Sequence, residues 1–150
     1  MKCGDVQIKY KIDGDWELKK ASEAASGYDL CSIREYEIPF NTPILVKTGL
    51  YLEIPPGFEG QVRSRSGLAL KSGVFVLNSP GTIDADYRGE IGIILNNLKD
   101  TFTPFKINKG DRVAQLIICK LPNVALIKTT EFSKTIRQEN GFGSTGINLI

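Results

Sequence analysis

Short stretches that alternate apolar with polar residues, or that are rich in β-branched and aromatic residues, limit the fold of this chain more than any other feature. Side chains along a strand point alternately to its two faces, so a period of two residues predicts β-strands. Turn-forming sequences such as "PPG", "SPG" and "NKGD" recur about every ten residues, a spacing typical of sandwiches, jelly rolls and barrels. We therefore predict an all-β domain, with strands within 6–12, 43–54, 60–66, 73–77, 90–98, 112–121 and 124–129.

One stretch departs from this alternation. In "SRSGLALKSG" (64–73), Ser66 is placed to cap a helix and Gly73 to end it, so we predict one or two helical turns there. A short helix presents unpaired backbone amides at its start, which suit an anion.

The composition excludes several kinds of chemistry. The chain has 150 residues, enough for one domain with a core, and its 41% hydrophobic and 24% charged residues are typical of globular proteins. Its net charge of +2 is too small for a general attraction to nucleic-acid backbones. The chain has no histidine, which excludes a Ser-His-Asp triad, a Cys-His pair and a histidine-ligated zinc site. Carboxylates, hydroxyls, guanidinium groups, amides or an oxygen-bound metal must carry any chemistry.

The cysteines and the absence of long apolar runs indicate the compartment. Cys3, Cys31 and Cys119 are odd in number and lack CxxC spacing, so neither a zinc site nor a disulfide framework is predicted. No stretch resembles a signal peptide or approaches the roughly 20 apolar residues of a membrane span. We expect a cytoplasmic protein with no membrane partner and no nucleic-acid partner.

The stretch "NSPGTIDADYRGEI" (78–91) gathers groups that suit a nucleoside. The amide of Asn78 can bond a base edge, and Gly81 lets a flat ligand approach the backbone. Asp84 can polarise a water molecule, and Tyr87 offers a ring to pack on a sugar. The same residues also fit a plain turn that leads into a strand and carries solvated charges.

A second stretch, "RSRSGLA" (63–69), suits a phosphate. The guanidinium of Arg65, the hydroxyl of Ser66 and the amides of Ser66 and Gly67 together form a cradle for an anion. Alternatively, Arg63 and Arg65 lie on one face of an ordinary strand and form surface ion pairs.

Three more stretches carry candidate residues. Asp29 is the ionised residue of "GYDLCS" (27–32), and it is a candidate for a metal-shell or network role. Asp111, Arg112 and Gln115 lie at the entrance of the strand predicted from "GDRVAQLI" (110–117). In "GFGSTG" (141–146), glycine backbone with Ser144 and Thr145 suits a terminal phosphate, and Phe142 suits a flat base.

The stretches "GYDL", "RSGLA", "NSPGTIDADYRGEI", "GDRVAQLI" and "GFGSTG", in this order, resemble the five motifs of the trimeric dUTP nucleotidohydrolases (dUTPases). The resemblance implies a distorted jelly-roll β-barrel (β-clip) with one short helix, assembled as a homotrimer with active sites at subunit interfaces. Residues 1–136 would form the jelly roll, and residues 137–150 an arm that closes over a neighbour's site. The implied activity is Mg²⁺-dependent hydrolysis of dUTP to dUMP and pyrophosphate. This reaction limits uracil incorporation into DNA and supplies dUMP for thymidylate synthesis.

The resemblance also implies a role for each motif. Asp84 would orient the attacking water, Tyr87 would pack on the deoxyribose and exclude a 2′-hydroxyl, and Asp29 would act through water on the magnesium. The residues that would read uracil are Asn78, Gly81, Thr82 and Ile83. The residues that would hold the phosphates are Arg65, Ser66, Gly67 and Gln115. The residues of the arm that would clamp base and γ-phosphate are Arg137, Phe142, Gly143, Ser144 and Thr145.

Some residues depart from the family pattern or bear on rival functions. Gln138 and Asn140 stand where the family commonly has glycine, which could alter arm closure.

The related dCTP deaminases place a glutamate after the aromatic residue of the third motif. Arg88 stands there in this chain, and a guanidinium cannot shuttle a proton. A non-catalytic nucleotide-gated binding protein would be favoured by loss of the water-activating carboxylate, but Asp84 is present.

Overall fold

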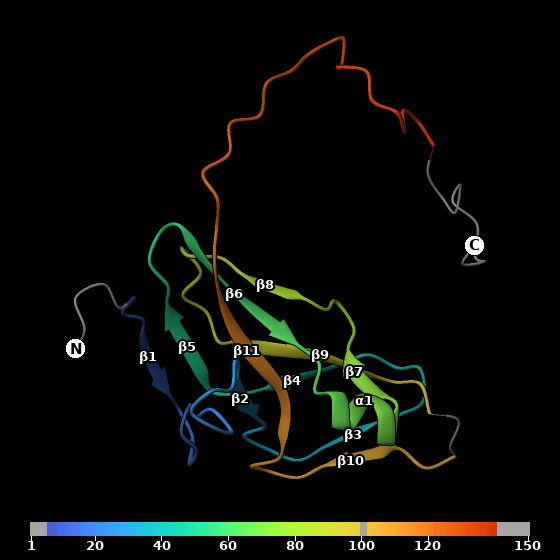
Figure 1. The fold of residues 1–150 in the computed structure, drawn as a ribbon. Helices are drawn as coiled ribbons and strands as arrows, with labels where there is room; N and C mark the ends of the chain where they lie inside the picture. The colour runs from blue at the N-terminus through green and yellow to red at the C-terminus, as the bar shows by residue number, and fades with distance from the viewer. Residues whose placement is uncertain (1–5, 100–101, 141–150) are drawn as a thin grey trace.

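The computed structural model describes residues 6–99 and 102–140, which form eleven short strands and one helix (Figure 1). The elements in chain order are β1 (Lys9–Ile12), β2 (Tyr28–Cys31), β3 (Tyr36–Ile38), β4 (Ile44–Lys47), β5 (Leu50–Glu53), β6 (Phe58–Arg63), α1 (Ser66–Ser72), β7 (Val74–Val76), β8 (Gly81–Ile83), β9 (Gly92–Asn97), β10 (Phe105–Ile107) and β11 (Arg112–Lys120). The predicted all-β fold with one short helix is confirmed.

The strands pair into small antiparallel sheets whose members lie far apart in sequence. The larger sheets have the orders β2-β11-β6-β8 and β4-β9-β7, and β1 pairs with β5 and β3 with β10. Few neighbours within a sheet are consecutive in the chain, so the sheets are built by crossovers between layers, as in a jelly roll. Strand β11 is central because it pairs with both β2 and β6.

The core lies between these sheets and follows the predicted alternation. In β5, Leu50 and Leu52 are buried while Glu53 is exposed, and in β9, Ile93 and Leu95 are fully buried. Full burial of a side chain of this size contributes about 1.5 to 3 kcal/mol. Alternating apolar residues of these strands therefore hold the layers together.

The stretch 43–54, predicted from one continuous pattern, divides into β4 and β5, which belong to different sheets. Gly49 turns the chain with φ of 67°, and a Cβ atom there would lie 2.5 Å from the carbonyl oxygen of Asp13. The buried hydroxyl of Thr48 donates to the carbonyl of Ile91 at 2.6 Å, and Trp16 Nε1 donates to the Thr48 carbonyl at 2.8 Å. The β4–β5 turn (residues 48–49) is thus rigidly fixed.

Helix α1 ends where the sequence predicts, but its N-cap residue differs from the predicted one. The prediction that Ser66 caps the helix is wrong, because Ser66 is its first residue and the extended Arg65 occupies the N-cap position without a side-chain capping bond. The prediction that Gly73 ends the helix is confirmed: Gly73 is left-handed (φ 63°) and its N–H donates to the Ala69 carbonyl at 3.1 Å. Among the residues that the structure describes, no helix is long and apolar enough to cross a membrane.

The strand predicted within 124–129 is wrong for the isolated chain. Residues 121–140 leave the body after β11 and extend away from it (Figure 1), and all of them are exposed. The exposed residues include Leu126, Ile127, Phe132 and Ile136. A strand needs a hydrogen-bonding partner, and none of the strands in the two described ranges pairs with this stretch.

Candidate active site

The hairpin that carries the third motif is built around β8. Gly81 lies opposite Val62 of β6 and Ile83 opposite Gly60, so β8 lies along the edge of the four-stranded sheet. A Cβ atom on Gly81 would lie 3.2 Å from Nδ2 of Asn78, so the absence of a side chain lets the Asn78 amide lie against this backbone. Asn78 and Thr82 are exposed and available to a ligand.

The segment that follows β8 (residues 84–90, the substrate loop) carries the exposed carboxylate of Asp84. The Asp84 carbonyl accepts the N–H of Tyr87 at 3.1 Å, which closes a tight turn. Arg88 Nη1 donates to the carbonyls of Ala85 at 2.7 Å and Tyr87 at 2.9 Å. Arg88 therefore holds the loop's own backbone, and the ring of Tyr87 remains about half exposed at the surface.

Glu90 attaches this loop to the β4–β5 turn, a contact that the sequence analysis missed. Its carboxylate accepts hydrogen bonds from Lys47 Nζ and from the N–H of Gly49, both at 2.9 Å. Burial alone would raise the pKa of Glu90, but the bonds from Lys47 and Gly49 outweigh it and lower the pKa. The same bond raises the pKa of Lys47. The pair thus remains ionised across the neutral range.

The candidate phosphate cradle forms where β11 pairs with two strands at once. Gln115 lies opposite Asp29 of β2 and opposite Arg63 of β6. Its Nε2 donates to the carbonyl of Ser64 at 3.0 Å, at the point where β6 leads into α1. Strand pairing therefore brings together three motifs that are up to about 90 residues apart, counted from Asp29 to Gln115.

Asp29 is the centre of the cradle. Its Oδ1 lies 3.5 Å from Arg65 Nε and its Oδ2 lies 3.1 Å from Arg112 Nη1, while Arg65 Nη1 donates to the Arg112 carbonyl at 2.7 Å. The Asp29 side chain is only 19% exposed. Two guanidinium groups around one carboxylate leave a net charge of +1, which attracts an anion. Ser66 and Gly67 follow Arg65 directly and are exposed.

Arg112 has no role in the sequence analysis, although it completes this cluster. It lies at the start of β11 opposite Cys31, two residues from Asp29 on the neighbouring strand. Only the register of β2 with β11 places it there. A cavity of about 280 Å³ lies beside the cluster, and it is lined in part by Arg65, Asp111 and Arg112.

The acidic residues restrict how a metal ion can bind. Within 6–99 and 102–140, no group of three or more Cys, Asp or Glu side chains could hold a metal ion. Both oxygens of Asp29 already face guanidinium groups. This arrangement fits contact through water with a magnesium ion that is held mainly by phosphate oxygens, and it does not fit a dedicated cage of carboxylates.

One chain does not bring the hairpin and the cradle side by side. Asp84 follows Ile83, which pairs with Gly60, whereas Arg65 lies beyond the other end of β6. At the rise of an extended strand, residues 60 and 65 are roughly 15 Å apart. Figure 1 shows the same arrangement, with α1 at one end of β6 and the substrate loop leaving β8 toward the other. Any site that joins the two needs a second chain or a very extended ligand.

The arm residues are placed only in part. Arg137 is exposed within the extended segment, and its Nε donates to the carbonyl of Asn140 at 2.7 Å. Phe142, Gly143, Ser144 and Thr145, predicted to clamp base and γ-phosphate, lie outside the described residues.

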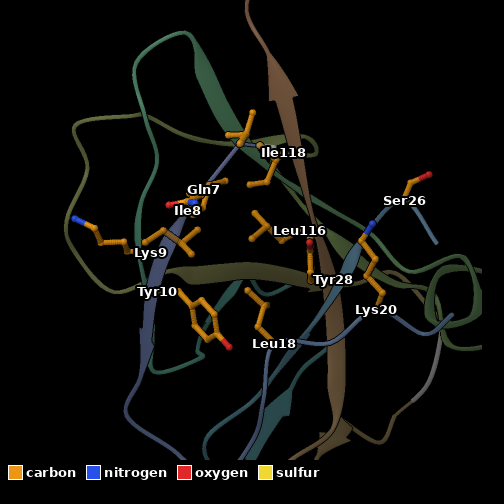
Figure 2. A pocket seen from close by; sticks show the side chains of 12 residues that line it. Gln7, Ile8, Lys9, Tyr10, Leu18, Lys20, Ser26, Tyr28, Leu116 and Ile118 are labelled. Atoms are coloured by element: carbon orange, nitrogen blue, oxygen red, sulfur yellow. The ribbon is translucent and has the colours of Figure 1, made fainter. Parts of the chain in front are cut away.

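A larger cavity, of about 620 Å³, lies away from these residues. Figure 2 shows it between β1, β2 and β11, with Tyr10, Leu18 and Leu116 pointing into it. Its lining mixes apolar residues with Gln7, Lys9, Lys20 and Ser26, and it includes none of the candidate catalytic or phosphate-binding residues. We place the candidate site at the hairpin and the cradle, because the polar and charged groups of the candidate motifs gather at these two places.

Comparisons with known proteins find similar proteins over most of the chain. A family model described as dUTPase matches residues 16–146. The chain is 51% identical to the deoxyuridine 5'-triphosphate nucleotidohydrolase of Hydrogenobaculum sp. (strain Y04AAS1) over 129 residues, 85% of this chain and 88% of that protein. It is 47% identical to the enzyme of the same name from Crocosphaera subtropica over 139 residues, 93% of this chain and 89% of that protein.

Solved structures show the same fold. The G164S mutant of the dUTPase of Staphylococcus bacteriophage 80alpha, with dUpNHpp, has a TM-score of 0.84 at 25% identity, over 94% of this chain and 99% of that one. The dUTPase of phage phi11, described with a structural Mg(II) ion, has a TM-score of 0.76 at 23% identity, over 85% of this chain and 99% of that one. Since motifs, fold and relatives agree over most of its length, the chain belongs to the dUTPase family.

Proposed function

We propose that this protein hydrolyses dUTP to dUMP and pyrophosphate with Mg²⁺. The observation that carries the proposal is the exposed carboxylate of Asp84, held in a tight turn directly after the nucleoside-sized hairpin of β8. In a chain without histidine, such a carboxylate is the group best placed to activate water. The relatives named deoxyuridine 5'-triphosphate nucleotidohydrolase support the same substrate.

In this mechanism Asp84 orients a water molecule for in-line attack on the α-phosphorus. No covalent nucleophile takes part, so the rate enhancement comes from positioning and charge stabilisation. Asn78 and the backbone of Gly81 to Ile83 bond the uracil edge, where the close packing at Gly81 brings the backbone near the base. Tyr87 packs on the deoxyribose and excludes a 2′-hydroxyl.

The phosphates bind in the cradle. Arg65, the Ser66 hydroxyl, the Gly67 amide and Gln115 hold phosphate oxygens, and the net positive charge around Asp29 favours them. The magnesium ion, when bound, supplies further neutralisation of the triphosphate charge. Asp29 would contact this ion through water, and its carboxylate holds Arg65 and Arg112 in place.

The proposed active unit is a homotrimer with a site at each subunit interface. The separation of hairpin and cradle along β6 supports this, because a second chain can bring its own hairpin to the cradle. The exposed apolar side chains of residues 121–140 also support assembly, since large apolar surfaces usually mark an interface. The arm of residues 137–150, with Arg137 and Phe142, then closes over a neighbour's site.

A substrate panel tests the activity. Purified protein is incubated with Mg²⁺ and, in separate reactions, dUTP, dCTP, dTTP and UTP, and nucleoside monophosphate and pyrophosphate are measured separately. We expect dUTP to be preferred, with both products formed in equal amounts. In heavy-oxygen water the label should enter dUMP. Label in pyrophosphate, or release of ammonia from dCTP, would contradict the proposal.

Mixed subunits test the shared site. Asp84→Asn removes the water-orienting group of the hairpin, and Arg65→Ala removes an arginine of the cradle, so each variant alone should be nearly inactive. Co-expressed, the two should regain activity, because about a quarter of the sites in randomly mixed trimers combine an intact hairpin with an intact cradle. The measurement is activity per subunit, with sedimentation to show that mixed trimers form. Mixed trimers without recovery would mean that each chain builds its own site.

A further inference from the structure

The ring of Tyr87 lies directly against the backbone of Gly89. A Cβ atom on Gly89 would lie 2.5 Å from Cζ and 2.9 Å from Cε2 of the Tyr87 ring, closer than real carbon contacts allow. The same hypothetical atom would approach the Tyr87 hydroxyl oxygen even more closely. Any residue larger than glycine at position 89 must therefore move this ring.

The hydroxyl group of Tyr87 also forms a hydrogen bond with Glu90, the residue after Gly89. The Tyr87 hydroxyl donates to the backbone carbonyl of Glu90 at 3.1 Å. Gly89 and Glu90 thus support the hydroxyl end and one edge of the Tyr87 ring, and we call this support the tyrosine seat.

The seat is attached to the body through the side chain of Glu90. Its carboxylate is bonded to Lys47 Nζ and to the N–H of Gly49, both at 2.9 Å, and it is only 19% exposed. Gly49 belongs to the β4–β5 turn, where the buried Thr48 hydroxyl donates to the Ile91 carbonyl. The residue after Glu90, Ile91, is itself fully buried, and its N–H donates to the Leu50 carbonyl at 2.8 Å.

We propose that Gly89 and Glu90 are positioning residues that set the discrimination between deoxyribonucleotide and ribonucleotide, by holding the Tyr87 ring on a seat fixed to the β4–β5 turn. The inference rests on the proposed function, in which Tyr87 packs on the sugar. Neither residue touches the substrate. The Tyr87 ring is about half exposed, so on a loop that is not attached to the body it could move aside and admit a 2′-hydroxyl. The tyrosine seat prevents this movement of the ring.

Graded substitutions of Glu90 test the seat. Glu90→Ala removes the bond to Gly49 in the turn and the bond to Lys47 at the end of β4, whereas Glu90→Gln keeps an oxygen that can accept the Gly49 N–H. We expect the ratio of kcat/KM for dUTP to that for UTP to fall about tenfold or more in Glu90→Ala and less in Glu90→Gln, since a small misplacement of a positioning group can cost up to about a hundredfold. Glu53→Gln is the matched control, because Glu53 forms one surface ion pair with Lys9.

Two further variants test whether the change in the dUTP-to-UTP ratio arises from the position of the Tyr87 ring. Gly89→Ala should lower the same ratio without touching Glu90. Tyr87→Ala should lower it as well, and adding Glu90→Ala to Tyr87→Ala should change it little further, because the seat acts only through the ring. Independent, multiplied losses in the double variant would overturn the proposal.

A measurement without substrate separates the seat from the proposed function. Hydrogen exchange of the peptide covering residues 84–91 should be at least several times faster in Glu90→Ala than in the unaltered protein or in Glu53→Gln, with little change in β9 and β11. If the hydrogen-exchange rate of this peptide were the same in Glu90→Ala as in the unaltered protein, the proposed role of the tyrosine seat would be wrong, even if the enzyme were fully active. An unaltered protein that hydrolyses none of the nucleotides would instead overturn the proposed function.

Discussion

Replacing Asp84 by asparagine is expected to lower kcat for dUTP hydrolysis by about a hundredfold to ten-thousandfold, the usual effect of losing a general base. Asparagine has nearly the same shape but cannot take the proton from water. Because the side chain is exposed and its backbone carbonyl makes the turn bond to Tyr87, the fold and nucleotide binding should be retained. Single-turnover rates at saturating dUTP, with binding of a non-hydrolysable analogue, measure the two effects separately.

Asp86→Asn is the matched control for this experiment. Asp86 is the other exposed aspartate of the substrate loop, and its replacement removes the same charge from the same surface. We expect this variant to keep kcat within severalfold of the unaltered protein. If Asp86→Asn were as slow as Asp84→Asn, the loss would reflect the charge of the loop, and Asp84 would not be the group that activates water.

Replacing Asp29 by alanine is expected to damage the cradle as a whole. The carboxylate neutralises Arg65 and Arg112 at 3.5 and 3.1 Å, so its removal leaves two guanidinium groups facing each other without their shared partner. Asp29 and Arg65 are mostly buried but Arg112 is about half exposed, so we take the lower end of the cost of removing one partner from a hydrogen-bonded charge pair, about 2 kcal/mol. We therefore expect kcat/KM for dUTP to fall by about thirtyfold or more.

The magnesium dependence shows how Asp29 acts. If the main role of Asp29 is to hold the arginines, Asp29→Ala should raise KM at every Mg²⁺ concentration, and Arg112→Gln should reproduce part of the loss. If excess Mg²⁺ restored full activity to Asp29→Ala, the carboxylate would act chiefly on the metal. Asp15→Asn is the control, since Asp15 is largely exposed and pairs with Lys109 alone.

Much of the fold could be predicted from local patterns. The alternation in 112–121 corresponds to β11, and that in 73–77 to β7, because each strand has one buried face. Strands β2, β3, β8 and β10 were missed. Each has three or four residues and, unlike β7 within 73–77, does not lie in a longer stretch that shows a strand pattern. The stretch 124–129 is rich in apolar and β-branched residues, but no strand of the described chain pairs with it.

In the candidate site, too, some features could be predicted from local sequence and others could not. Glycines at positions 73 and 81 could be assigned from sequence, because a left-handed turn and a close backbone approach each require a missing side chain. The partners of Asp29 and Glu90 could not be assigned. Arg112 lies 83 residues after Asp29, and Lys47 lies 43 residues before Glu90. Nothing in the local pattern of these residues distinguishes them from solvated surface charges.

The sequence by itself determined the all-β character of the fold, the order of the motifs and the kinds of chemistry available to a chain without histidine. These follow from residue types and short periods, which act over a few neighbouring residues. Only the tertiary structure decided that Gln115 lies opposite Asp29, that Arg112 completes the cradle, and that Glu90 attaches the loop of Tyr87 to the β4–β5 turn. Strand register is set by the packing of the whole core, and a shift of one residue would turn each of these side chains to the other face of its sheet.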